Sequence, residues 1–252
     1  MAIVGAVFAA AVAFRFTAGP ELRPSRAVLT GESASDQSQF EVRVRNYLLE
    51  HPEVIIEAIQ ELEARRQAEA QSEAAGMLAA RTDELYADPD SPVGGNTAGD
   101  ATIVEFFDYN CPYCRRVASV LTEAIAADAG LRVVYKEFPI LGANSVLAAR
   151  AALAAHRQGR YVEFHEALMT RQGVIDSNAV WDAAEALGLD VTQLRRDMED
   201  PNVQAAIERS IELARALRIT GTPGFVIGDQ ILRGATDLGM MQSLVQRARE
   251  SR

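Results

Sequence analysis

The chain has 252 residues, of which 48% are apolar and 24% are charged, the composition of an ordinary globular protein with one or two domains. The formal net charge is −10. This excess of acidic residues argues against a nucleic-acid partner, because binding to phosphates needs clustered Lys and Arg side chains.

Residues 2–14 form an unbroken apolar run that ends at Arg15. The run is shorter than the ~20 residues of a membrane span, but it has the length of a signal-peptide hydrophobic region. The basic region that opens a signal peptide is missing, because only Met1 precedes the run. We therefore expect residues 1–18 to be a signal peptide or a membrane anchor. The rest of the chain would then be periplasmic, either soluble after cleavage or tethered to the inner membrane.

A flexible linker is expected over residues 19–39, because its Pro, Gly and Ser residues cannot bury apolar area. Residues 40–87 are then predicted to form a helical arm. Phe40, Val44 and Leu48 have helical spacing, and a His-Pro step divides the arm into two helices. The apolar stripe of the second helix is too thin to form a core of its own. The arm either lies on the main domain as a solvated helix or pairs with other copies of the chain.

Turn residues mark the start of the main domain, which extends over residues 88–252. A strand, a helix and a second strand follow one another closely, so the two strands should be parallel. The predicted elements are a strand at 101–109, a helix at 111–127, a strand at 131–138, a helical insertion at 143–217, an antiparallel hairpin around Gly228 and a helix at 237–250. The predicted fold is therefore α/β, with a central mixed sheet, an inserted helical subdomain and an N-terminal helical arm.

Cys111 and Cys114 are the only cysteines, and two residues separate them. A disulfide across so short a loop stabilises the fold by only about 2 kcal/mol, against about 4.7 for a hundred-residue loop, so a structural role is disfavoured. Cys111 stands where a strand ends and a helix begins. The helix dipole and the unpaired amides there favour the thiolate, so we expect Cys111 to have a lowered pKa and to be the exposed, attacking sulfur. Cys114, one turn on, is expected to be the shielded, resolving thiol.

Other uses of two cysteines fit the sequence less well. A structural zinc site needs four ligands, and the three histidines, His51, His156 and His165, are scattered. They are expected to be surface or helix residues without a role. A cysteine protease needs a histidine next to its nucleophilic cysteine, and nothing near Cys111 in the sequence indicates one. We expect no metal and no cofactor other than the redox-active disulfide itself.

The sequence Phe-Phe-Asp-Tyr-Asn-Cys-Pro-Tyr-Cys, followed much later by Gly-Thr-Pro-Gly at residues 221–224, resembles the thioredoxin superfamily. The helical insertion makes it similar to the DsbA-like branch of thiol–disulfide oxidoreductases. The Pro-Tyr dipeptide between the cysteines, the Thr before the second Pro and the N-terminal arm are closest in style to the ScsC and DsbG types. The resemblance implies a thioredoxin fold with a cis peptide bond before Pro223, packed against the cysteines. It also implies that Thr222 binds substrate backbone by strand addition, with Pro112 and Tyr113 as further substrate contacts.

The resemblance implies two more site residues. The buried acid that the family places before the first cysteine corresponds to Glu105, and the basic residue on the next strand corresponds to Lys136. This pair would lie beneath the sulfurs and assist proton transfer to or from Cys114. The alternative is that one of the two points to solvent. Lys136 and Glu137 alternate in direction along the strand, so only one of them can face the site.

The resemblance implies a periplasmic enzyme that forms or isomerises disulfides in exported proteins through its Cys-Pro-Tyr-Cys. Its partners would be unfolded or misoxidised exported proteins, a membrane redox partner of the DsbB or DsbD/ScsB type, and further copies of the chain through residues 40–87. Whether it acts as oxidase, isomerase or reductase stays open. The alternative function is a non-catalytic oligomeric chaperone or a thiol-based copper-binding protein.

Overall fold

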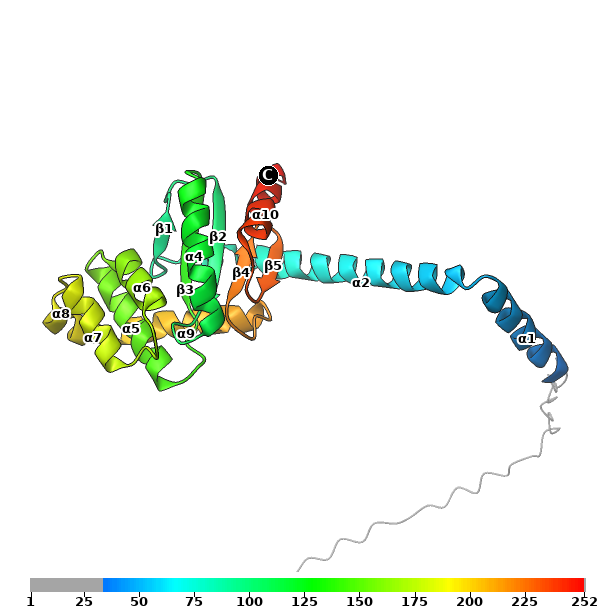
Figure 1. The fold of residues 1–252 in the computed structure, drawn as a ribbon, viewed down its shortest axis with the longest axis horizontal. Coiled ribbons are helices and arrows are strands. Elements are labelled where there is room, and N and C mark those ends of the chain that lie inside the picture. The colour runs from blue at the N-terminus through cyan, green and yellow to red at the C-terminus, as the bar shows by residue number, and fades with distance from the viewer. Residues whose placement is uncertain (1–33, 252) are drawn as a thin grey trace, which may run out of the picture. The chain divides into compact units, whose positions relative to one another are not determined.

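The structure, a computed structural model, describes residues 34–251 (Figure 1). Contacts within the chain divide it into two compact units, Met1–Gln60 and Glu61–Arg252. The expected signal peptide or anchor at residues 1–18, and most of the expected linker, lie outside the described residues. In the part of the chain that is described, no helix is both long and apolar enough to span a bilayer.

The first unit contains α1 (Ala34–Glu50) and the start of α2 (Glu53–Ala79), and the predicted break between the two helices is confirmed. The expectation that the linker continues to residue 39 is wrong, because α1 begins before Phe40. Asp36 lies in the first turn of α1, where the helix dipole favours a carboxylate. Gln37 donates a hydrogen bond to the Glu41 carboxylate one turn later, at 2.8 Å, which supports the early start.

The second unit is built on a five-stranded sheet with the order β1-β3-β2-β4-β5. The strands are β1 (Val93–Gly95), β2 (Ala101–Phe107), β3 (Leu131–Glu137), β4 (Gly224–Ile227) and β5 (Gln230–Arg233). β2 and β3 are parallel, and the other pairs are antiparallel, so the predicted strand–helix–strand unit and the hairpin are confirmed. β1 was not predicted, because its Gly-Gly sequence resembles a turn. Gly94 is needed there, since a Cβ atom at this position would lie 2.9 Å from the ring of Tyr135.

Helices cover both faces of the sheet. In chain order they are α3 (Thr82–Tyr86), α4 (Pro112–Ala127), α5 (Ala143–Arg157), α6 (Tyr161–Thr170), α7 (Ser177–Ala186), α8 (Val191–Met198), α9 (Pro201–Ala216) and α10 (Leu238–Glu250). One buried cluster joins Ile103 and Phe107 of the sheet to α4, α10 and the helical insertion. The second cluster joins Val104 and Phe106 to α3, α9 and the end of α2. Successive residues of β2 therefore face different layers of helices, as the period of a strand requires.

Candidate active site

Cys111 lies after the turn that follows β2, directly before the first residue of α4. It is the N-cap of α4 in an extended conformation, with φ −80° and ψ 118°, and Pro112 follows in the first helical turn, where its missing N–H costs nothing. The preceding turn is held by hydrogen bonds. The Asp108 carboxylate accepts from the amides of Asn110 at 2.8 Å and Leu141 at 2.9 Å, and the Asp108 carbonyl accepts from the Cys111 amide at 3.0 Å. The first cysteine is thus fixed at the positive end of a sixteen-residue helix.

The two sulfurs differ in their surroundings. Both cysteines are free thiols, and Cys111 is 4% exposed whereas Cys114 is completely buried. The expectation that Cys111 is exposed is therefore wrong for its side chain, although it remains the more accessible of the two. The Cys111 thiol donates to the carbonyl of Thr222 at 3.3 Å. Burial, and after it the charge of Glu105, raise the pKa of Cys114.

The Thr222-Pro223 segment comes from the far end of the chain. The peptide bond between them is cis, as the resemblance implies. The Pro223 carbonyl accepts from the amide of Gly234 at 2.8 Å, which ties this loop to the end of β5. Tyr113, in contrast, is 54% exposed, and the guanidinium of Arg116 lies 5.3 Å from the centre of its ring. Of the four expected substrate contacts, Thr222 lies at the Cys111 sulfur, Pro223 is buried, and Pro112 and Tyr113 are exposed.

The expected pairing of Glu105 with Lys136 is wrong. Glu105 lies beside Tyr135 in the parallel register of β2 and β3, and Lys136 lies beside Phe106, so the two side chains point to opposite faces of the sheet. The Lys136 ammonium is buried on the α3 side. It donates to the Ser91 hydroxyl at 2.6 Å, the Glu84 carbonyl at 2.6 Å and the Asp88 carboxylate at 3.2 Å. Lys136 therefore anchors α3 and the segment after it to the sheet.

Glu105 is left without a basic partner on the cysteine face. It is 1% exposed, and neither of its carboxylate oxygens has a hydrogen-bond partner in the described part of the chain. Burial raises its pKa to about 8, so the carboxyl group is neutral at pH 7. The Glu105 carboxyl group therefore lies on the face of the sheet that carries Cys114, the thiol whose pKa its charge raises.

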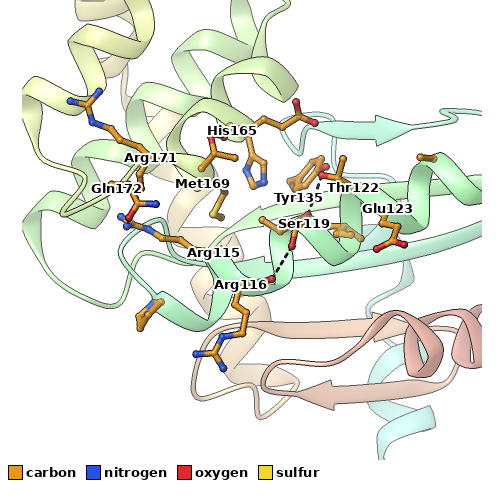
Figure 2. Close-up of a pocket in the computed structure, with 16 residues that line it drawn as sticks. Arg115, Arg116, Ser119, Thr122, Glu123, Tyr135, His165, Met169, Arg171 and Gln172 are labelled. Atoms are coloured by element: carbon orange, nitrogen blue, oxygen red, sulfur yellow. Dashed lines mark hydrogen bonds between the residues drawn. The ribbon is translucent and has the colours of Figure 1, made fainter.

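A groove of about 780 Å³ runs beside the active site, between α4 and α6 (Figure 2). Its floor contains Leu121 and Met169, both almost fully buried, and its lining includes Pro112, the residue after the first cysteine. Tyr135 and His165 also line it.

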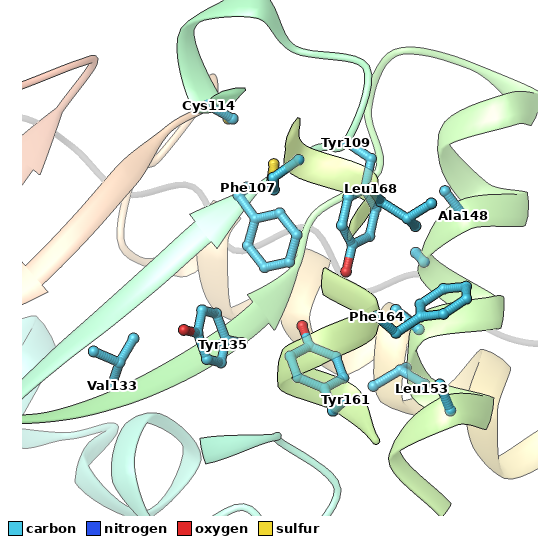
Figure 3. Close-up of a cluster of buried hydrophobic side chains, with 14 of the residues drawn as sticks. Phe107, Tyr109, Cys114, Val133, Tyr135, Ala148, Leu153, Tyr161, Phe164 and Leu168 are labelled. Atoms are coloured by element: carbon cyan, nitrogen blue, oxygen red, sulfur yellow. The ribbon is translucent and has the colours of Figure 1, made fainter. Parts of the chain in front are cut away.

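Glu137 is a second buried acid on the cysteine face. It follows Tyr135 by two residues, so the two side chains share a face, and its carboxylate accepts from the Tyr161 hydroxyl at 2.7 Å and the Tyr109 hydroxyl at 3.2 Å. Figure 3 shows Tyr109 and Tyr161 among the buried side chains of this face. Burial raises its pKa well above the usual value. The Tyr109 hydroxyl also lies 3.3 Å from Nδ1 of His165, whose pKa is lowered by burial to about 3. Side chains alternate in direction along a strand, so the sequence predicts that only one of Lys136 and Glu137 faces the site. In the structure that residue is Glu137.

Comparison with known proteins identifies the family. The model of the DSBA-like thioredoxin domain matches residues 102–246, and that of the copper resistance protein ScsC N-terminal domain matches residues 36–69. The chain belongs to the DsbA-like thioredoxin family. The first match includes Cys111, Cys114, Thr222 and Pro223, and the second covers most of α1 and of α2.

Individual proteins resemble the chain over different parts of their length. A thioredoxin-like oxidoreductase from Silicibacter pomeroyi is 49% identical over 67% of this chain and 97% of its own, with a TM-score of 0.66. The catalytic domain of Proteus mirabilis ScsC is 30% identical over 70% of this chain and 98% of its own, with a TM-score of 0.64. The thiol:disulfide interchange protein DsbA of Bordetella parapertussis is 28% identical over 59% of this chain and 73% of its own. The chain also matches the Na(+)/H(+) antiporter NhaA 1 of Salinispora arenicola at 28% identity, over 64% of this chain but only 25% of the antiporter.

Proposed function

We propose that this chain catalyses thiol–disulfide exchange in exported protein substrates, with Cys111 as the attacking and attacked sulfur and Cys114 as the resolving thiol. The observation that carries the proposal is the asymmetry of the two sulfurs. Cys111 caps α4 beside the Thr222 carbonyl, whereas Cys114 is fully buried one turn later. A substrate sulfur can approach only the first of them.

Each step exchanges one sulfur–sulfur bond for another. In the reducing direction, the Cys111 thiolate attacks a substrate disulfide, forms a mixed disulfide and releases one substrate thiolate. The Cys114 thiolate then attacks Cys111, which releases the second substrate thiolate and leaves the Cys111–Cys114 disulfide. The oxidising direction is the reverse of these steps. In isomerisation, the released substrate thiolate instead attacks another disulfide of the same substrate. The thiolate freed there attacks the substrate sulfur of the mixed disulfide, which releases Cys111 as a thiolate without net transfer of electrons.

Glu105 supplies the proton exchange that the buried sulfur needs. Cys114 must lose a proton before it attacks and regain one when the disulfide is reduced. Glu105 lies on the same face, is buried, and has two unbonded carboxylate oxygens. Its raised pKa of about 8 lies near the operating pH, which is where a general acid–base group works best.

The location follows from the chemistry. Disulfides form and persist in oxidising compartments, so the proposed setting is the periplasm, with unfolded or misoxidised exported proteins as substrates. A membrane partner would set the direction: one of the DsbB type would reoxidise the cysteines, and one of the DsbD/ScsB type would reduce them.

Copies of the chain would associate through the arm, because Phe40, Tyr47 and Ile56 expose more than half of their surface.

The test is the refolding of scrambled ribonuclease by the purified protein and by its Cys111→Ala and Cys114→Ala variants. The proposal expects the parent to restore ribonuclease activity and Cys111→Ala to fail. Cys114→Ala should keep part of the isomerising activity but lose the ability to oxidise substrate thiols or to reduce substrate disulfides. Equal refolding by the parent and Cys111→Ala would refute catalysis and favour a chaperone that binds without exchange.

A thiol-based copper-binding protein is the second candidate, because the arm matches the N-terminal domain of a copper resistance protein. Titration with Cu(I) separates the two functions. Tight binding of one Cu(I) per chain, lost in both cysteine variants, without any refolding activity of the parent, would favour copper binding.

A further inference from the structure

The groove between α4 and α6 has a built-in charge polarity. Arg115 and Arg116 lie in the first turns of α4, near the cysteines, while Glu123 lies about two turns further along the same helix (Figure 2). Glu166 lines the groove from α6. None of these four side chains forms an ion pair with any residue of the described range. The groove is therefore basic at the active-site end and acidic farther along α4.

The floor of the groove is apolar and fixed, while the hydroxyl residues Ser119 and Thr122 line it from α4. Leu121 and Met169 are at most 3% exposed. The ring of His165 stacks on Tyr161 and meets Tyr135 with ring centres 4.7 Å apart, and the hydrogen bond to Tyr109 holds it in place. Burial lowers the pKa of His165 to about 3, so it adds no charge at neutral pH. The groove thus combines a preformed apolar floor with Arg116 and Glu123 at different distances from the active site along α4.

The position of the groove relates it to the reacting sulfur. Pro112, directly after Cys111, lines its end, whereas Thr222 belongs to the loop before β4. Figure 2 shows the β4–β5 hairpin and α6 on opposite sides of α4. A polypeptide whose cysteine is bonded to Cys111 must continue in two directions. One direction leads along Thr222, and the other leads into the groove.

We propose that the groove binds the extended substrate segment on one side of the substrate cysteine and selects its charges. This inference rests on the proposed exchange activity. The selected segment has an acidic residue near Arg116, an apolar centre and a basic residue near Glu123. Seven helical residues separate Arg116 from Glu123, about 10 Å at 1.5 Å per residue. An extended chain covers that distance in about three residues, which sets the spacing of the two substrate charges.

The test uses the oxidised protein and four cysteine peptides in excess, in which two peptide thiols reduce the Cys111–Cys114 disulfide and leave as a peptide disulfide. Two peptides carry the acidic residue nearer the cysteine and the basic residue three positions farther out, one on each flank. The other two have these charges exchanged. The rate is followed by alkylation of the new thiols and mass spectrometry. Reduced glutathione, which has no segment to fill the groove, measures the intrinsic reactivity of Cys111.

On one flank, the matching peptide should react about tenfold faster than its exchanged counterpart at low salt, and this ratio should fall toward one at high salt. The double variant Arg116→Glu with Glu123→Arg should reverse the preference between the two peptides of that flank. The preference is the ratio of two rates measured on the same variant, so a change in the intrinsic reactivity of Cys111 cancels. Arg247→Glu is the matched control, because Arg247 is an exposed residue of α10 outside the groove. Arg247→Glu should leave the ratio between the matching and the exchanged peptide unchanged at low and at high salt.

A parent protein that reacts with glutathione but does not distinguish the peptides overturns the groove proposal and leaves the exchange function intact. A parent that reacts with no thiol overturns the exchange function instead. Benzoylphenylalanine at Ser119 identifies the occupant, and cross-links are expected to the peptide. Cross-links only to the arm of a second copy would also overturn the proposal.

Discussion

Replacement of Glu105 by Gln tests the electrostatics of the site most sharply. Glu105 is fully buried on the cysteine face, without a hydrogen-bond partner in the described part of the chain, and its pKa rises from 4.5 to about 8. The folded-state pKa of Glu105 lies above its unfolded value, because the buried carboxyl group is more stable protonated than ionised. The stability that this protonated group contributes is fully present below pH 4.5. That stability is lost as the pH rises from 4.5 through 8.

The size of the effect follows from the shift. Each pH unit between the two pKa values changes the free energy of unfolding by about 1.4 kcal/mol, so the parent loses about 3 kcal/mol between pH 4.5 and pH 7 through Glu105 alone. Gln carries no proton to lose. The Glu105→Gln variant should therefore match the parent near pH 4.5 and exceed its stability by about 3 kcal/mol at pH 7.

The assay is urea unfolding of the reduced parent and variant at a series of pH values. The difference between the two free energies of unfolding isolates Glu105 from other titrating groups, such as Glu137. Glu212→Gln, an exposed substitution on α9, controls for the loss of a carboxylate. A difference between parent and Glu105→Gln that does not change with pH would refute the assignment of Glu105 as an unpaired buried acid. The same variant should slow the step in which Cys114 loses its proton, while mixed-disulfide formation at Cys111 keeps its rate.

Three further predictions concern groups around the site and in the arm. Lys136→Met should lower the free energy of unfolding by about 3 kcal/mol, because it leaves the Asp88 carboxylate without its buried partner, yet folded protein should keep its exchange rate. A large loss of exchange in stably folded Lys136→Met would instead support a catalytic lysine. Tyr161→Phe should cost about 1–2 kcal/mol in urea unfolding, because Glu137 loses its 2.7 Å hydrogen bond; an unchanged stability would contradict that bond. Val44→Asp, in the exposed apolar stripe of the arm, should reduce the mass measured by analytical ultracentrifugation to that of a monomer, and a monomeric parent would contradict self-association through the arm.

Much of the fold could be predicted because its strongest patterns are local. The apolar strand before Cys111, the amphipathic helix after it and the hairpin at Gly228 have periods or turn residues that a sequence displays directly. The cis peptide at Pro223 followed from the resemblance, since a Thr-Pro step alone is compatible with a trans bond.

The features that were missed depend on register and on tertiary packing. Nothing in the sequence alone states that Lys136 pairs with the Phe106 position, yet that register turns the side chain away from Glu105. The burial of Cys111 involves the Thr222 carbonyl, 111 positions later in the chain. β1 forms because Gly94 leaves room for the ring of Tyr135, a contact between segments that are distant in sequence.

The division of labour between the two sulfurs is the central claim, and trapping of mixed disulfides tests it most directly. The reduced Cys114→Ala variant is mixed with a disulfide-containing exported protein, and the products are separated without reductant. A mixed disulfide at Cys111 should accumulate, because the resolving thiol is missing, and the reduced Cys111→Ala variant should form none. Accumulation of a mixed disulfide at Cys114 in the Cys111→Ala variant, or of none in either variant, would contradict the account.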